Sequence, residues 1–487
     1  MAEPTTTDDV DTVGGGSSGL ATAASAAEAR LRVLVLEKQP ELGGTTAIAV
    51  GSFTANRTAF QRAAGIDDSL DAHVLDSGRF APPEIESRNA SELRRFFLSH
   101  AAETLDWLTG MGLVFHGPAP EPPNRVPRMH NVVPDARAYI AALERRTRQH
   151  GGTILCSAAV TSLTRSGNRV TGVNADVAGE SKSFTAARGV VLAAGDYASA
   201  PEIIARHKGD RFAAVEGINS HACGDGQVLA ESAGAELINM DITYGPELRF
   251  VVPPELPYRQ LSRIARSRHV APLLARIMPL LPRSLMQRIA KRLVVTWQHP
   301  ENALFEDGAV LVNAAGRRFC EETASPDREI AVAQQPGKCA WLLLDQRLCE
   351  RYSQWPHFIS TAPQIAYAYV NDYLRLRPDV SREAASLDAL AEAGNLPLDA
   401  LRASAAGMWG RRWVLLGPVK AWFTTTEGGA AIDTQFHVLD SRGHPIPGLY
   451  AVGQNGLGGQ ILWGHGLHIA WAITSGRLCG RALAKAN

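Results

Sequence analysis

The sequence predicts an α/β fold in which a mostly parallel sheet carries helices and a second unit interrupts the chain. The first observation is a glycine turn at 14–19, followed by an alanine-rich helical stretch and an apolar strand pattern at 31–36. The second is a pair of further strand patterns near 153–156 and 190–193, separated by helical stretches. The third is a cluster of prolines after Met240, which ends the glycine-rich α/β pattern and indicates a domain boundary.

The composition agrees with a globular protein of two to three domains. The chain has 487 residues, of which 45% are hydrophobic and 20% are charged, so it can bury large cores. These values exclude a disordered chain, a coiled coil and a small disulfide-stabilised domain. The formal net charge is +0, which argues against a polycation that binds nucleic acid.

The cysteines and the N-terminal residues predict a cytoplasmic protein without a metal site. The 6 cysteines form no CxxC pair and no short Cys/His cluster, as is usual in a reducing compartment. The first residues, MAEPTTTDDVD, are acidic and polar and do not resemble a secretory signal. No stretch reaches the roughly 18 apolar residues that a membrane-spanning helix needs.

The glycine turn predicts a dinucleotide site. Gly14 permits the tight turn, Gly16 lets the backbone approach a pyrophosphate, and Gly19 lets the helix pack closely against the strand. Ser17 and Ser18 begin the helix, whose N-terminus favours phosphate. Glu37 ends the next strand, where a carboxylate can accept a hydrogen bond from a ribose hydroxyl.

The strand before this turn departs from the expected pattern. Residues 10–13 read Val-Asp-Thr-Val, which is short and polar where a run of buried apolar residues is usual. We therefore expect a frayed or shifted strand at this position.

Two further segments distinguish FAD from NAD and carry a resemblance to a known family. Gly43, Gly44, Thr45 and Thr46 supply small and hydroxyl side chains soon after Glu37. Far downstream, the sequence Ile-Pro-Gly-Leu-Tyr-Ala-Val-Gly-Gln at 446–454 resembles the "IPGLYAAGE" segment of the succinate dehydrogenase and fumarate reductase flavoproteins and of the 3-ketosteroid dehydrogenases. Other motifs of that family follow in order, at 190–195 ("VVLATGG"), 223–226 ("TGDG") and 311–319 ("LVNxxGxRF").

The resemblance implies a Rossmann-like FAD-binding domain with an inserted α+β capping domain. The FAD domain would comprise residues 1–240 and 425–487, and the cap residues 241–424. By the same resemblance, further cofactor contacts are expected at Lys38, Ala194, Gly195, Asp225, Gly453, Gln454, Gly466, Leu467 and Ile469.

The cationic groups with which family members hold a dicarboxylate are missing here. Residues 424–429 read Thr-Thr-Thr-Glu-Gly-Gly, with threonines where the family has histidines. The arginines expected near 305–309 and in the loop 460–466 have no counterpart, and Leu462 and Trp463 occur instead. We therefore expect a neutral or singly charged, partly apolar substrate that contacts Leu462 and Trp463.

The loop 461–466 is similar to the "TYAGPG" loop of the 3-ketosteroid dehydrogenases, in which a tyrosine hydroxyl and a glycine N–H hold the substrate carbonyl. Gly466 is retained, but the tyrosine position falls on Leu462, so half of that carbonyl clamp is either missing or replaced by His465 or Trp463. Such donors form an oxyanion hole that stabilises an enolate.

A base must also remove the α-proton, and four residues are candidates. Tyr197 follows the strand that leads towards the flavin, and Tyr244 begins the cap; either could instead be an ordinary packed aromatic residue. His465 and His468 flank Gly466 in a glycine-rich loop, although isolated histidines are more often structural.

Arg128 and His130 form a further candidate contact with a substrate carboxylate. The alternative is that both residues belong to a solvated loop.

The segment 256–294 carries many arginines and lysines and no acidic residue, interleaved with leucine, isoleucine and methionine. It could form short cap helices with a solvated basic face. It could also form an amphipathic element that touches anionic lipid at the inner membrane face or guards access for an apolar substrate. RNA binding is the least supported alternative, since aromatic residues are not interleaved.

The favoured hypothesis is FAD-dependent α,β-desaturation of a cyclic ketone such as a 3-ketosteroid, 4-oxocyclohexanecarboxylate or cyclohexanone, with an external electron acceptor. The first alternative is an ene-reductase that reduces an activated C=C bond with the same residues. The second is a non-catalytic flavoprotein that binds a membrane or a partner through its cap.

Overall fold

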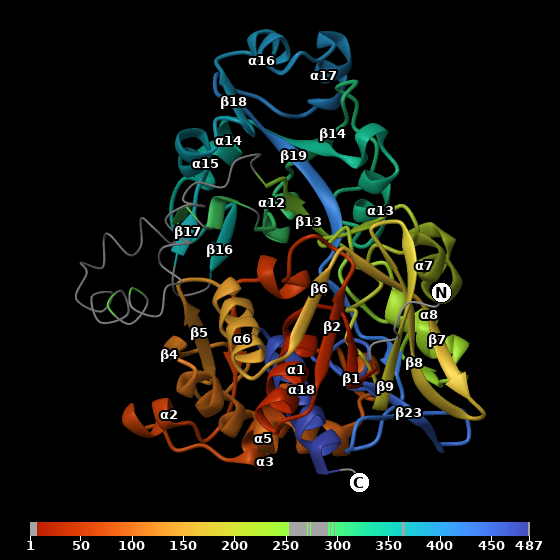
Figure 1. The fold of residues 1–487 in the computed structure, drawn as a ribbon. Coiled ribbons are helices and arrows are strands. Elements are labelled where there is room, and N and C mark those ends of the chain that lie inside the picture. Colours follow the sequence, from red (N-terminus) through yellow and green to blue (C-terminus); the bar gives the residue numbers. More distant parts are fainter. Residues whose placement is uncertain are drawn as a thin grey trace.

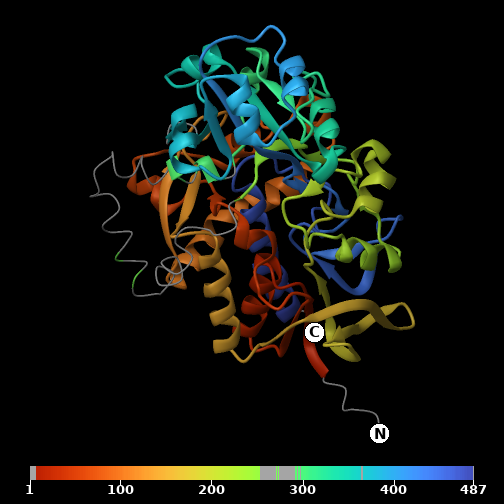
Figure 2. The same cartoon turned by 90° about the horizontal axis from the view of Figure 1, so that it is seen from above.

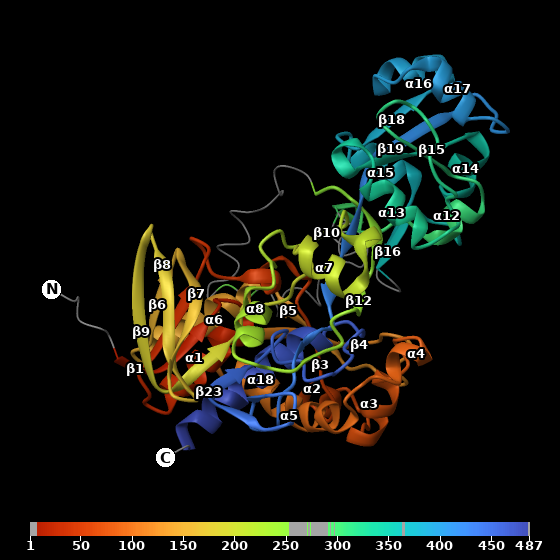
Figure 3. The same cartoon turned by 90° about the vertical axis from the view of Figure 1, so that its right-hand side faces the viewer.

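A computed structural model describes residues 7–252, 298–362 and 366–485, together with residues 270, 273, 291, 292 and 294–296. The basic segment 256–294 lies almost entirely outside these residues, so its two interpretations stay predictions. Figures 1 and 3 show a lower unit built around the N-terminal strands and an upper unit formed by the middle of the chain.

The lower unit contains an eight-stranded sheet whose central strands are parallel, as predicted. The order is β22-β23-β9-β1-β2-β6, and the pairs β23/β9, β9/β1, β1/β2 and β2/β6 are parallel. β7 and β8 extend β9 as an antiparallel meander, and Figure 2 shows this hairpin at the margin of the molecule, far from the upper unit. The strands are β1 (Thr7–Val13), β2 (Val33–Glu37), β6 (Thr153–Cys156), β7 (Ala158–Ser166), β8 (Arg169–Val177), β9 (Glu180–Leu192), β22 (His437–Leu439) and β23 (Pro445–Ala451).

The expectation of a frayed first strand is wrong, whereas a local shift is present. β1 is a central strand of seven residues, in which Val10 pairs with Val33 and Asp11 with Leu34, and its pairing with β9 changes register between Asp8 and Val10. Asp11 and Thr12 are fully buried in spite of their polarity. Parallel ladders on both sides hold the backbone in place whichever side chains it carries, so sequence polarity was a poor guide here.

A helix made mostly of small residues packs closely against a second helix that contains two glycines. α1 (Ser17–Glu28) follows the glycine turn, and α18 (Leu467–Lys485) ends the described chain beside it. A Cβ atom added at Gly476 would lie 2.3 Å from the Ser18 carbonyl oxygen, and one at Gly480 would lie 2.5 Å from that of Thr22. The two backbones therefore approach closely only because glycine stands at both positions.

The upper unit is a mixed α+β layer around the long strand β19 (Trp413–Phe423). β13 (Glu247–Phe250), β15 (Ala340–Leu344) and β18 (Ser381–Ala384) pair with it antiparallel, and β10 (Glu216–Gly217) pairs with it parallel. β14 (Val310–Val312) extends β15. The helices of this unit are α12 (Asn302–Glu306), α13 (Asp327–Ala333), α14 (Gln346–Arg351), α15 (Val370–Leu376), α16 (Leu387–Gly394) and α17 (Leu398–Ser404).

The remaining elements connect or flank these two units. A three-stranded sheet of β3 (Ser52–Thr54), β5 (Met129–Val133) and β4 (Val114–Ala119) lies with helices α2 (Ala59–Ala63), α3 (Leu70–Ser77), α4 (Pro83–Glu86) and α5 (Ser91–Gly110). α6 (Arg137–Gln149), α7 (Pro201–Lys208) and α8 (Asp225–Ser232) complete the lower part, and β16 (Ser360–Ala362) pairs with β17 (Ala366–Ala368).

Two short ladders join the places where the chain leaves and re-enters the lower unit. β11 (Leu237–Ile238) pairs with β21 (Gly429–Ala430), and β12 (Thr243–Tyr244) pairs with β20 (Thr425–Thr426). The domain boundaries near 240 and 425 stay a prediction, but these ladders bring both segments to one place.

No helix among the described residues is long and apolar enough to cross a bilayer. In the same part of the chain, no group of three or more His, Cys, Asp or Glu side chains could hold a metal ion.

Candidate active site

The glycine turn and the start of α1 form an open phosphate cradle. Gly14 has a φ of +114°, and a Cβ atom there would lie 2.4 Å from the Ala193 carbonyl oxygen, so only glycine fits. A Cβ at Gly16 would meet nothing closer than 4.0 Å. Gly16 is also the N-cap of α1, and no side chain caps this helix. The first amides of α1 therefore remain available to an anion in front of Gly16.

Glu37 is held at the end of β2 by two hydrogen bonds, and its carboxylate can accept further ones. Its Oε2 accepts a hydrogen bond from Gly15 N–H at 2.7 Å, and its Oε1 accepts one from Gln39 N–H at 2.8 Å. A carboxylate has about four acceptor sites, so two remain for ribose hydroxyls. Next to it, Lys38 Nζ lies 2.6 Å from Asp225 Oδ2, which ties β2 to the start of α8.

The structure brings the second glycine pair beside the first. Gly43 N–H donates to the Gly15 carbonyl oxygen at 3.0 Å, and the hydroxyls of Ser17 and Thr46 lie 2.8 Å apart. Thr45 Oγ1 accepts a hydrogen bond from Asn219 at 3.0 Å. The predicted contacts at 43–46 thus line the same cradle as residues 14–19.

Asn455 organises the loop after β9, and the sequence reasoning missed it. Its Oδ1 accepts from Ala194 N–H at 2.6 Å, and its Nδ2 donates to the Gly195 carbonyl oxygen at 2.8 Å. Asn455 is 2% exposed. Its position directly after the Gly453–Gln454 motif was the available signal.

Gly453 has a different role from the one expected. Its N–H donates to Ser475 Oγ and its carbonyl oxygen accepts from Trp471 Nε1, both at 3.0 Å. Both polar groups of its backbone are therefore used within α18, and the predicted contact of Gly453 with the cofactor is not supported. Gly453 instead joins β23 to α18.

The start of α18 forms a second open helix terminus. Gly466 has a φ of +80°, and a Cβ there would lie 2.9 Å from the backbone of Ser52. No described residue accepts a hydrogen bond from Gly466 N–H. Leu467 is buried and Ile469 is half-buried in the first turn. This terminus can stabilise negative charge on a ligand.

These features fit a dinucleotide such as FAD. The uncapped start of α1 suits a pyrophosphate and Glu37 suits a ribose. The open start of α18 suits a ring system that gains negative charge. All three lie at the carboxyl ends of parallel strands, where ligands bind in open α/β sheets.

Tyr197 is not placed to act as a base, contrary to the first candidate role. It is 0% exposed, and its hydroxyl donates to the Met240 carbonyl oxygen at 2.7 Å. Burial raises the pKa of this phenol far above its usual value. The hydroxyl therefore keeps its proton and supports the packing of the 240 segment.

Tyr244 and Trp463 form one wall of the site. Their rings meet edge to face with centroids 5.4 Å apart. Burial raises the pKa of Tyr244 to about 12. Its hydroxyl accordingly remains protonated at neutral pH, and Tyr244 can act as a hydrogen-bond donor.

His465 forms an ion pair with Glu121 at the edge of the closing loop, which comprises residues 456–466. Its Nδ1 lies 2.6 Å from Glu121 Oε1, and the same oxygen accepts from His465 N–H at 2.8 Å. The hydrogen bond that His465 donates to the Glu121 carboxylate raises the pKa of His465. The ring is 73% exposed, so it can act as a cationic donor to a ligand in front of the loop.

Leu462 does not line the site as expected. It is 0% exposed, and its N–H donates to Glu427 Oε2 at 3.1 Å. Leu462 therefore packs in the core of the lower unit and presents no surface to a substrate.

A buried polar chain extends from the loop after β9 to α18. Thr425 Oγ1 donates to Asp196 Oδ2 at 3.1 Å and accepts from Gln454 Nε2 at 2.6 Å. Gln454 Oε1 lies 3.1 Å from His468 Nδ1, and His468 Nε2 lies 3.0 Å from Glu427 Oε1. Burial raises the pKa of Asp196. Two buried carboxylates thus lie at the two ends of one network.

Glu427, Asp196 and Thr425 were not among the predicted site residues. The signal for Glu427 was available, because it stands between the threonines and glycines of the 424–429 motif. Its contact with His468, which lies far away in the sequence, could not be read from that motif.

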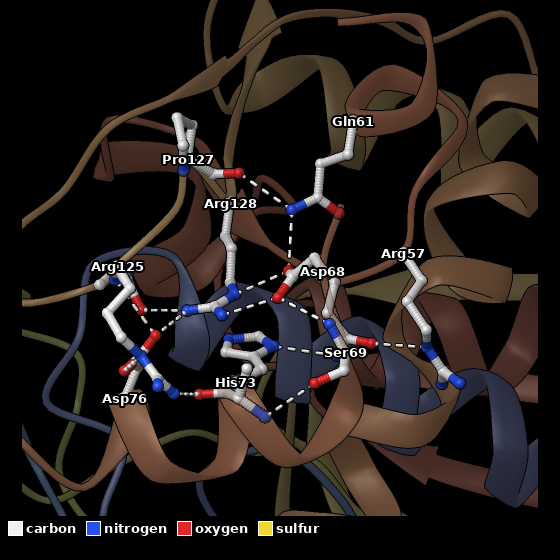
Figure 4. Close-up of polar contacts among 12 residues, drawn as sticks. Arg57, Gln61, Asp68, Ser69, His73, Asp76, Arg125, Pro127 and Arg128 are labelled. Carbon is white, nitrogen blue, oxygen red and sulfur yellow. Dashed lines mark hydrogen bonds and ion pairs between the residues drawn. The ribbon is translucent and has the colours of Figure 1, made fainter. Parts of the chain in front are cut away.

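Arg128 and His130 are structural, so the predicted substrate contact is wrong. Arg128 is 0% exposed, and Figure 4 shows its guanidinium between Asp68 and Asp76, at 2.7 and 2.6 Å. His130 is also 0% exposed and contacts Thr58 Oγ1 at 3.0 Å. Burial lowers the pKa of His130 to about 4.

Comparison with known proteins agrees with this geometry. A family model described as an FAD binding domain matches residues 9–267 and 264–460. A probable fumarate reductase of Shewanella frigidimarina is 25% identical over 512 residues, which cover 99% of this chain and 76% of the relative.

Two solved structures share the fold. The open conformation of a flavocytochrome c3 fumarate reductase has a TM-score of 0.73 and 22% identity, with 99% of this chain and 79% of the other chain covered. The 3-ketosteroid-Δ4-(5α)-dehydrogenase from Rhodococcus jostii has a TM-score of 0.61 and 22% identity, with 100% and 99% covered. These relatives are oxidoreductases, which argues against the non-catalytic alternative. The chain therefore belongs to the FAD-binding family that includes the fumarate reductase flavoproteins, and it is an FAD-dependent oxidoreductase.

Proposed function

We propose that the protein dehydrogenates a cyclic ketone between the α- and β-carbons, with a 3-ketosteroid or 4-oxocyclohexanecarboxylate as the substrate type. The observation that carries the proposal is that the charged side chains of the site are already engaged with partners inside the protein. Glu427 is 0% exposed and bonds the closing loop directly, and the buried Asp196 belongs to the same network. The nearby cation Arg249 is paired with Glu247 at 2.8 Å.

This arrangement disfavours a dicarboxylate, because each of its two charges would need a cationic partner once it leaves water. Arg249 is already paired with Glu247 and His465 with Glu121. A ketone with no charge or a single charge needs fewer cationic partners, and the rings of Tyr244 and Trp463 offer it an apolar surface.

Three groups of the chain have roles in the reaction. The Tyr244 hydroxyl and Gly466 N–H donate hydrogen bonds to the carbonyl oxygen, which stabilises the enolate that forms when the α-proton leaves. His468 takes that proton. FAD, when bound, supplies the acceptor for the hydride that leaves the β-carbon. An external electron acceptor is then required for the next turnover.

Reduction of an activated C=C bond is the second candidate, since the same groups serve both directions. The similarity to a probable fumarate reductase favours it.

Anaerobic stopped-flow spectroscopy tests the proposal and separates the two directions. The oxidised-flavin absorbance should decay on mixing with a saturated cyclic ketone, and the product should contain a new C=C bond. Reoxidation of the pre-reduced flavin by an enone, without any reaction of the saturated ketone, would establish the reductase instead. Fast turnover of succinate or fumarate would contradict the cyclic ketone as the substrate and the argument against a dicarboxylate.

A further inference from the structure

The protonation of the contact between Glu427 and His468 follows from the hydrogen-bond partners of the neighbouring side chains. Gln454 Nε2 lies 2.8 Å from the Thr426 carbonyl oxygen, which only accepts hydrogen bonds, so this atom is the amide nitrogen. Gln454 Oε1 consequently faces His468 Nδ1. Because an amide oxygen only accepts, His468 Nδ1 carries a hydrogen.

The other ring nitrogen then faces a carboxylate oxygen. His468 Nε2 lies 3.0 Å from Glu427 Oε1. Both atoms are buried, neither has a hydrogen-bond partner among the described residues, and the close contact between them is not aligned as a hydrogen bond. A neutral Nε2 and an ionised Oε1 would be two acceptors in close contact, which is unfavourable. One proton must therefore reside on one of these two atoms.

We propose that Glu427 and His468 hold one proton between them, and that this pair is the store of the proton that the reaction moves. We call these two residues the proton pair. The inference rests on the proposed function, because it assigns the proton of that same reaction. In the reducing direction the proton passes to the α-carbon while the hydride arrives at the β-carbon, and in desaturation both movements are reversed.

Three other titratable side chains interact with the pair. They are Asp196 and Tyr197, in the loop after β9, and Tyr244 on β12, and burial raises the pKa of each. Glu427 Oε2 meanwhile holds Leu462 N–H, so the carboxylate is anchored to the closing loop.

The test uses the purified holoprotein with FAD and does not need the substrate. Protons taken up per flavin on anaerobic photoreduction are measured in weakly buffered solution across pH 5 to 9, together with the visible spectrum of the oxidised flavin. In the wild type we expect a pH-dependent spectral transition and a matching step in proton uptake. Both should be lost in Glu427→Gln and in His468→Asn.

Glu427→Gln separates the two roles of this side chain. The amide oxygen of the glutamine can still accept the hydrogen bond from Leu462 N–H, but the glutamine has no titratable proton. Glu103→Gln is the matched control, since Glu103 pairs with Arg477 and Arg481 on α18 and is 54% exposed. It should keep both signals. Asp196→Asn tests which group causes the pH-dependent spectral transition. The transition should persist in this variant if the proton pair causes it.

Activity supplies a second readout. With a reacting ketone or enone, Glu427→Gln should lower the rate of the flavin half-reaction by about 10²-fold or more at unchanged KM, and Glu427→Asp should restore part of the loss. An unchanged spectrum, proton uptake and rate in Glu427→Gln would overturn the proposal. If Glu427→Gln does not retain FAD, the same measurements are made on His468→Asn, in which loss of both signals supports the proposal and unchanged signals contradict it. Spectral and proton-uptake effects without turnover of any ketone or enone would contradict the proposed function but not the proton pair.

Discussion

Single buried side chains decide most of the chemistry at the residue scale. Tyr197, Glu427 and Asp11 are all 0% exposed, but each has a different set of partners. Tyr197 donates to a backbone carbonyl, Glu427 contacts a histidine, and Asp11 has no hydrogen-bond partner among the described residues. Residue type alone would have ranked a tyrosine first as the base, whereas the buried hydroxyl of Tyr197, which donates to a backbone carbonyl, argues against that role.

Tyr197→Phe should leave the chemistry nearly intact. The variant loses the hydrogen bond to the Met240 carbonyl oxygen, so we expect a loss of stability of about 1–3 kcal/mol. Thermal unfolding measures that loss, and stopped-flow flavin reduction should stay within about threefold of the wild type because the phenol is not the proton acceptor. A decrease of several orders of magnitude would restore Tyr197 as the base.

Asp11→Val should stabilise the protein, and more strongly at higher pH. Burial, with a smaller contribution from Asp8, raises the pKa of Asp11 to about 7. The folded state therefore binds more protons than the unfolded state between about pH 4 and pH 7, so stability falls as the pH rises through this window. The melting temperature of Asp11→Val should exceed that of the wild type by a larger margin at pH 8 than at pH 5. The gain is on the order of 2–4 kcal/mol at pH 8.

At the scale of elements, the site depends on how closely two helices approach. α1 presents its N-terminus to the phosphate cradle, α18 presents its own beside the closing loop, and Gly476 and Gly480 let them cross. The cofactor contacts at both ends therefore share one structural requirement.

Gly476→Ala should weaken FAD binding from a distance. The added methyl group would lie 2.3 Å from the Ser18 carbonyl oxygen, so the helices must separate. We expect a loss of about 1–3 kcal/mol in stability and a measurably higher Kd for FAD in a flavin-fluorescence titration. Gly110→Ala is the matched control, because a Cβ there meets nothing within 4 Å. Equal behaviour of the two variants would show that this crossing is not tight.

At the scale of the whole molecule, buried charges hold the α2–α3 region against β5. Arg128 contacts Asp68 and Asp76, and all three are buried (Figure 4). Burial opposes ionisation of the two carboxyls, but hydrogen bonds from Arg128 and its neighbours outweigh it, so the pKa of each carboxyl lies below its usual value. Their stabilisation is complete above the unfolded-state pKa of about 3.9 and is lost as the pH falls through the folded-state values.

Arg128→Met should therefore destabilise the protein without a specific effect on substrate. We expect a loss of about 3–5 kcal/mol, since two carboxylates lose their buried partner. Arg88→Met, which breaks the exposed pair with Asp241, should cost less than about 1 kcal/mol. Chemical denaturation measures both. A change in KM with unchanged stability in Arg128→Met would support the original substrate role.

The sequence by itself determined the parallel sheet, the glycine cradle with Glu37 and, through the family motifs, the FAD cofactor. These follow from local patterns, since turn, helix, strand and motif are each read within a few tens of residues. Only the tertiary structure decided which side chains meet and which are enclosed. Glu427 and His468 are brought together from separate segments, while Tyr197, Leu462 and Arg128 are fully buried. Proton transfer depends on contacts and burial, and these arise only when distant parts of the chain pack against each other.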